Sequence, residues 1–161
     1  MFAETDEVLA DLNRRATAAK DTKDWAAAVD LLYQAKAREG IHYQDTRLAL
    51  TLQQAGRFDE AMAEFDWLLD HVVAQCDAAV PQMAPVHYKH SLALRRSKIH
   101  DKIRVAAKRE KRADLVLTHQ ALVDLYQGEV DKLATALERE WQAERRAYDK
   151  REAARVKRLV S

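Results

Sequence analysis

The residues best suited to charge-based recognition lie between positions 86 and 110. Arginine and lysine recur there at spacings of three, four and seven, which places them along one side of a helix. These residues are Arg95, Lys98, Lys102 and Arg109. A row of cationic side chains can follow a phosphate backbone or hold an acidic protein surface. The alternatives are a solvated helix face, or one that pairs with acidic residues elsewhere in the chain.

A second group consists of potential metal ligands, because imidazole and thiolate are donors that suit zinc. Its members are His71, Cys76, His87 and His90. Their spacing matches no known zinc motif, so we expect no metal site. The histidines at 42, 100 and 119 have no neighbouring Cys or carboxylate in the pattern of a triad or dyad, and there is no Gly-rich phosphate loop. The sequence therefore predicts no cofactor and no enzymatic activity.

Composition indicates which elements carry these groups. Three Gly and two Pro, against 48% hydrophobic and 33% charged residues, are too few turn formers for a sandwich or barrel. The predicted class is all-α, as a single domain over residues 1–161. The single Cys76 excludes an internal disulfide, and residues 1–7 lack a signal-peptide pattern, so we expect a cytoplasmic protein. No run approaches the roughly 18 uncharged apolar residues that a membrane span requires.

Charge is distributed unevenly along the chain, although the formal net charge is +1. Residues 1–85 hold 8 Lys and Arg against 15 Asp and Glu, and residues 86–161 hold 19 against 11, which gives −7 and +8. Such an asymmetry favours internal pairing of the halves, head-to-tail association, or an acidic partner for the C-terminal half.

The apolar pattern of the predicted helices repeats at a fixed offset. Trp25, Ala28, Leu32 and Ala35 reappear 33 residues later as Phe58, Ala61, Phe65 and Leu68. Self-similarity at a period of 20 to 50 residues is the signature of stacked repeats. Asp24 is predicted to cap a helix, and Gly40 and Gly56 are predicted to provide turns. The clearest repeats span about residues 9–41 and 42–75.

A weaker copy follows at a shift of 72. Gly128, Val130, Leu133 and Leu137 match Gly56, Phe58, Ala61 and Phe65, in that order. This match predicts a turn at Gly128 and degenerate units at about 78–112 and 114–147. A charged C-terminal helix over 129–158 should keep an apolar face as far as Trp141 and Tyr148 and then project from the body.

The second repeat resembles the tetratricopeptide repeat (TPR). The resemblance is carried by the segment Leu48-Ala49-x-x-Leu52-x-x-x-Gly56-x-Phe58-x-x-Ala61-x-x-x-Phe65-x-x-Leu68. Small Ala49 and Ala61 should let two helices approach closely. The chain departs from the family pattern at Asp45, where the family often has Trp, at Val73 in place of a closing Pro, and at Lys23 in place of the turn Gly. The resemblance implies a short α-solenoid of three to four antiparallel helical hairpins.

The resemblance also implies a function, because TPR-like proteins bind a peptide or a helix on the concave surface formed by the first helix of each hairpin. This chain is accordingly expected to be a protein-interaction module or adaptor with another protein or peptide as its partner. The residues expected on that surface are Asn13, Arg14, Thr17, Lys20, Tyr43, Thr46, Arg47, Leu50 and Gln53. Two alternatives stay open. One is a nucleic-acid-associated protein that uses the basic residues 95, 98, 102 and 109, and the other is a homo-oligomer formed through the C-terminal helix.

Overall fold

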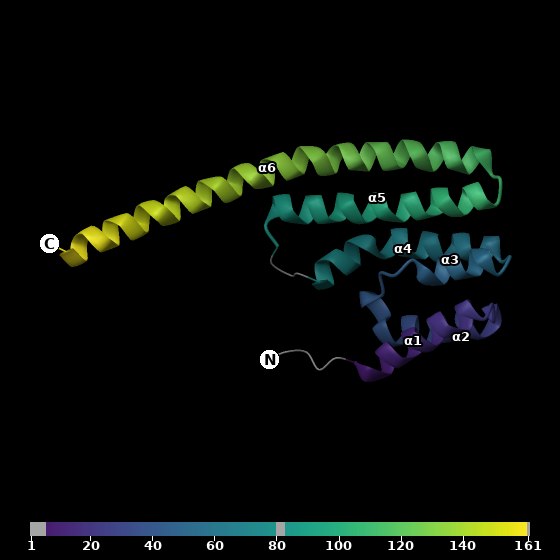
Figure 1. Ribbon diagram of the computed structural model, residues 1–161. Helices are drawn as coiled ribbons and strands as arrows, with labels where there is room; N and C mark the ends of the chain where they lie inside the picture. The colour runs from purple at the N-terminus through teal and green to yellow at the C-terminus, as the bar shows by residue number, and fades with distance from the viewer. Residues whose placement is uncertain (1–5, 80–82, 161) are drawn as a thin grey trace.

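The computed structural model describes residues 6–79 and 83–160, with the side chains of 159 and 160 left out (Figure 1). The described part consists of six α-helices and one 3₁₀ turn, which confirms the all-α prediction. None of its helices is long and apolar enough to cross a membrane. Pro81, whose ring is incompatible with a helix interior, lies outside the described residues.

Helices α1 (Glu7–Asp21) and α2 (Trp25–Glu39) both begin at an aspartate cap. The carboxylate of Asp6 accepts a hydrogen bond from the amide of Leu9 at 3.1 Å, and that of Asp24 accepts one from Ala27 at 3.1 Å. Each cap satisfies an amide that the first turn of a helix leaves unpaired. The predicted cap at Asp24 is therefore confirmed. Gly40 then ends α2 with φ +56° and opens the 3₁₀ turn η1 (Gly40–His42).

Helices α3 (Arg47–Gln54) and α4 (Phe58–Ala79) contain the segment that resembles a TPR. Ala49 and Ala61 are both fully buried, as predicted, and with Phe65 they belong to a core drawn from α1 to α5. The first repeat has the same burial pattern 33 residues earlier, since Ala28 and Leu32 are buried like Ala61 and Phe65. The two repeats thus use equivalent positions for packing.

Helices α5 (Pro85–Arg109) and α6 (Ala113–Val160) lie side by side along the length of α5 and run in opposite directions (Figure 1). Pro85 occupies the first turn of α5, where its missing amide costs no hydrogen bond. The predicted turn at Gly128 is wrong, because α6 passes through this residue without a break. A lone Gly among good helix formers costs only about 1 kcal/mol and does not end a helix. Of the predicted degenerate units, 114–147 therefore lies wholly within α6, and 78–112 contains the whole of α5.

Three of the helix connections share one turn geometry. Lys23, Gly56 and Lys111 have φ of +59°, +78° and +57°. At each turn this residue donates its amide to the carbonyl three residues earlier, and the next residue donates to the carbonyl five residues before itself, at 2.8–3.2 Å. This is the Schellman arrangement that closes a helix. Lys23 thus takes the role that Gly56 has in the second repeat.

The C-terminal part of α6 extends away from the body (Figure 1). Val130 is buried and Leu133 and Leu137 are half-buried, but Trp141 and Tyr148 are 54% and 58% exposed. The apolar face predicted as far as Tyr148 is present, but the helix projects from the body already beyond Leu137 and not only after Tyr148, because α5 begins only at Pro85 and covers no more of α6. We call residues 141–160 the arm.

Candidate partner-binding groove

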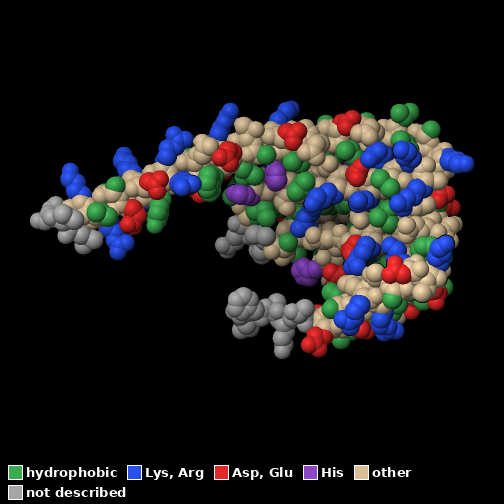
Figure 2. Space-filling view, viewed as in Figure 1, with side chains coloured by type: hydrophobic (Ala, Val, Ile, Leu, Met, Phe, Trp, Pro, Cys, Tyr) green, Lys and Arg blue, Asp and Glu red, His purple; other side chains and the backbone are tan. Residues whose placement is uncertain are grey.

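A groove of about 730 Å³ lies where the segment 44–46 meets α4, α5 and α6. Its apolar part is formed by Val72 from α4, Leu94 and Ile99 from α5, and Val123 from α6. Three cationic side chains of α5, Arg95, Lys98 and Lys102, line the same groove. Figure 2 shows Lys and Arg side chains gathered over α5 around this hollow. The groove therefore combines apolar surface with positive charge.

The cations of the groove have no counter-charge of their own. Among the described residues, Arg95, Lys98 and Lys102 make no hydrogen bond or ion pair, and Nη1 of Arg95 is buried without a partner. A buried donor without a partner is costly, and a ligand oxygen would remove that cost. Arg95 is thus the groove side chain with the most to gain from an anionic ligand.

The two acidic residues at the groove are already paired. Asp101 accepts a hydrogen bond from Nη2 of Arg104 at 2.7 Å, and Asp45 pairs with Arg47. Their charges are therefore partly neutralised by cations outside the groove lining. The result is a groove whose unpaired charges are positive, which suits carboxylate or phosphate groups.

The structure brings together members of both predicted surfaces. Thr46 lines the groove with Arg95, Lys98 and Lys102. Next to it, Nη2 of Arg47 donates to Oδ1 of Asn13 at 2.9 Å, which connects α3 to α1.

Four other predicted partner-binding residues lie on α1 or α3 outside the groove lining. Arg14 is exposed and paired with Asp11 at 2.8 Å, and Thr17 is exposed and donates to the carbonyl of Asn13. Lys20 and Leu50 are half-buried. Their role in binding stays a prediction.

Three predicted binding residues have structural positions instead. Tyr43 is buried against Trp67, and burial raises the pKa of its hydroxyl well above its usual value. Gln53 is buried, donates to Glu110 at 2.8 Å and accepts from Arg109 at 3.2 Å. Tyr43 and Gln53 are thus largely closed off from solvent, whereas Arg109 is exposed, lies outside the groove lining and donates a hydrogen bond to α3. The role of these three residues in binding stays a prediction.

A histidine pair between α5 and α6 was not predicted from the sequence. Nδ1 of His100 and Nδ1 of His119 lie 2.9 Å apart, and the His100 ring stacks on Tyr126 with centroids 5.6 Å apart. Burial, together with the charges of His119 and Arg96, lowers the pKa of His100 to about 4, and burial also lowers the pKa of His119, against the opposing charge of Asp66. These residues are 19 positions apart on different helices, so no local spacing could reveal the pair.

The four potential metal ligands named from the sequence do not form one cluster. His71 stacks on Trp67, Cys76 is buried, and His87 and His90 lie beside the start of the arm. Within residues 6–79 and 83–160 no group of three or more His, Cys, Asp or Glu is arranged to hold a metal.

The sequence analysis also missed the residues of the groove floor, since Val72, Gln75 and Val123 come from helices that only the tertiary structure brings together.

Comparisons of the chain with models of known protein families, with curated proteins and with solved structures gave no match.

Proposed function

We propose that this chain is a TPR-like protein-interaction module whose groove binds an acidic segment of another protein. The observation that carries the proposal is the groove itself, where unpaired Arg95, Lys98 and Lys102 stand beside apolar Val72 and Val123. An apolar floor with a charged rim is typical of sites that bind a peptide carrying both apolar and charged side chains.

A stacked-repeat architecture supports this proposal. The Schellman turns at Lys23 and Gly56 are 33 residues apart, and the same turn recurs at Lys111. The equivalent small residues Ala28 and Ala61 are both buried. We interpret α1–α2, α3–α4 and α5–α6 as three successive hairpins of a short solenoid, the last of them with much longer helices. In such a stack the groove lies between the second and third hairpins, where repeat proteins present extended binding surfaces.

Protein binding is favoured over nucleic-acid binding by the arrangement of charge. Arg109, the fourth of the basic residues predicted to bind nucleic acid, donates a hydrogen bond to Gln53, and the carboxylates of Asp45 and Asp101 lie at the groove. Among the residues that the structure describes, no aromatic side chain on which a base could stack lines the groove. A phosphate backbone would meet three cations beside two carboxylates, whereas a peptide can place its acidic side chains between them.

Binding is also favoured over catalysis. The described part of the groove lining contains neither His nor Cys, the residues that most often act as general base or nucleophile at neutral pH. We therefore propose a non-enzymatic adaptor, and a cytoplasmic location stays a prediction.

Affinity capture with the full chain, followed by calorimetry on the captured partner's binding segment, tests the proposal. The groove variant Lys98→Glu/Lys102→Glu should lose at least tenfold in affinity. The control Lys108→Glu/Lys132→Glu changes net charge equally at exposed sites outside the groove lining and should bind like the parent. Equal binding by both variants would refute the groove as the site. A salt titration with non-specific DNA and RNA tests the alternative, since several phosphate contacts give a steep log–log slope.

A further inference from the structure

The arm presents apolar side chains that no other helix of the described chain covers; the guanidinium of Arg145, on the arm itself, lies 5.4 Å from the centroid of the Trp141 ring. Trp141, Tyr148 and Val156 are each more than half exposed, and at about 100° per residue they lie within one side of the helix. This side continues the face of α6 that packs on α5 through Val130 and Leu137. Beyond the start of α5 the face therefore has the character of a packing surface but no neighbouring helix.

The start of the arm, with the three residues before it, is acidic, and the end of the arm is basic. Residues 138–144 hold three Glu and one Arg, and residues 150–158 hold five Lys and Arg and one Glu. Net charge thus changes from −2 to +4 over a helix of about 30 Å. An acidic protein would be repelled by the first end and a basic one by the second, whereas an identical helix laid in the opposite direction is attracted at both.

The positions of these charges around the helix support that pairing. Glu140, Glu144, Arg151, Arg155 and Arg158 all lie on the same edge of the apolar face. In an antiparallel pair of identical helices the same edges meet. A register with Trp141 opposite Val156 of the second copy then places Glu140 and Glu144 next to its Arg155 and Arg158. A parallel pair would set this edge against the opposite edge of the second helix, so these Glu and Arg residues would not meet.

We propose that two copies of this chain associate through their arms, antiparallel, with Trp141 packed near Val156 of the second copy. Each copy's basic end then lies beside the other's acidic start, near a hollow of about 290 Å³ lined by His87, His90 and Trp141. Within the body, α5 covers the apolar face of α6; in the dimer, the arm of the second copy covers the continuation of that face along the arm. Helices of about 30 Å bury less than the roughly 1,600 Å² of a standard interface, so the dissociation constant should be micromolar, about 1 to 100 μM.

Sedimentation equilibrium of the full chain at low salt, from about 1 to 200 μM, tests this proposal. The parent should be a dimer at the upper end of the range, and Arg155→Glu/Arg158→Glu should weaken the dimer at least tenfold. Glu140→Lys/Glu144→Lys should do the same. The variant with all four changes restores opposite charges across an antiparallel pair and should regain the dimer.

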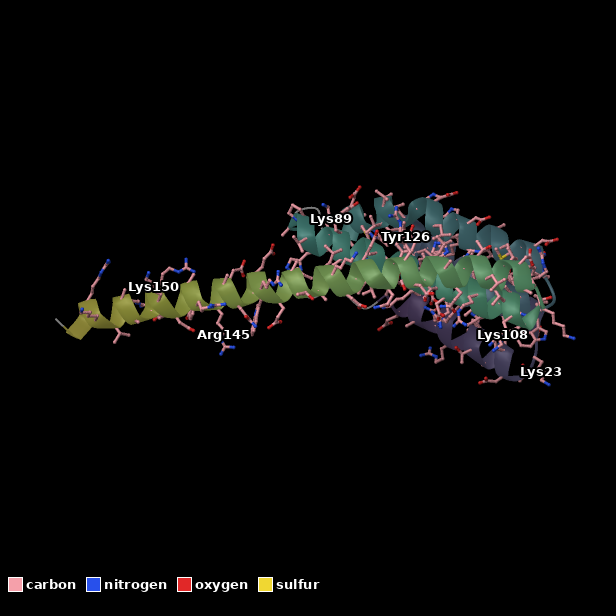
Figure 3. The ribbon with its side chains drawn as sticks, turned by 90° about the horizontal axis from the view of Figure 1, so that it is seen from above. Lys23, Lys89, Lys108, Tyr126, Arg145 and Lys150 are labelled. Carbon is pink, nitrogen blue, oxygen red and sulfur yellow. The ribbon has the colours of Figure 1, made fainter. Side chains whose placement is uncertain are left out.

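The control is Arg146→Glu/Lys150→Glu, which makes the same charge change as Arg155→Glu/Arg158→Glu but on the opposite side of the arm. Figure 3 shows Lys150 and Arg145 on opposite sides of this helix. The control should dimerise like the parent, and Trp141→Ala should remain a folded monomer. A parent that stays monomeric at 200 μM would overturn the proposal and assign the arm to a different partner. A dimer that the fourfold variant does not restore would overturn the antiparallel register.

Discussion

The histidine pair between α5 and α6 should make the stability of the fold depend on pH. Burial holds the pKa of His100 at about 4, below the value of 6.5 that it has in an unfolded chain. The unfolded state therefore binds more protons than the folded state between these values. Stability contributed by the neutral ring is present above pH 6.5 and is lost as the pH falls towards 4.

The size of the effect follows from the two pKa values. At 1.36 kcal/mol for each unit of difference, His100 alone should lower the free energy of unfolding by about 1 kcal/mol at pH 5.5. At pH 4.5 the loss should reach about 2 to 3 kcal/mol. The lowered pKa of His119 acts in the same direction, although the charge of Asp66 on α4 reduces its contribution; the effect of Arg96 is already part of the pKa of His100.

Urea denaturation of the full chain between pH 7.5 and 4.5, followed by circular dichroism, measures this quantity. The comparison is with His100→Phe, which keeps a ring against Tyr126 but has no proton to gain. The parent should lose stability relative to this variant as the pH falls. A second comparison is Tyr126→Phe, which keeps both histidines and should retain the pH dependence; Tyr126 is labelled in Figure 3. Parallel curves for the parent and His100→Phe would refute the reasoning.

Three further predictions concern packing, the arm and the groove. Ala61→Leu should overpack a fully buried site and lower the free energy of unfolding by roughly 1 to 3 kcal/mol, measured as a lower thermal midpoint. The control Ala63→Leu, at an exposed site, should leave the midpoint unchanged. An unchanged midpoint for Ala61→Leu would contradict the close packing of helices at Ala61. Deleting 149–161 should barely move the midpoint but weaken self-association, and a large loss of stability would show that the arm is docked. Lys98→Arg/Lys102→Arg keeps the charge of the groove and should retain most of the partner affinity that the Glu variants lose in calorimetry; equal losses would show that shape and not charge governs binding.

Local sequence was sufficient where structure depends on neighbouring residues. Asp24 caps α2, and Gly40 and Gly56 have a positive φ, because caps and turns are set by backbone geometry within a few residues. The buried positions Ala61 and Phe65 followed from helical periodicity, which depends on the face that a helix turns inward. The all-α class and the projecting C-terminal segment came from composition and from the loss of apolar residues along α6.

Tertiary structure decided what distant residues do to one another. Gly128 remains helical because α6 packs along α5, and Tyr43 and Gln53 are buried by neighbours that their own segment does not specify. The groove joins Thr46 to Arg95 across about 50 positions, and the pairing of His100 with His119 depends on how two helices meet. Such contacts depend on the angle and spacing between helices, which are set by side-chain packing over the whole core and not by any local pattern.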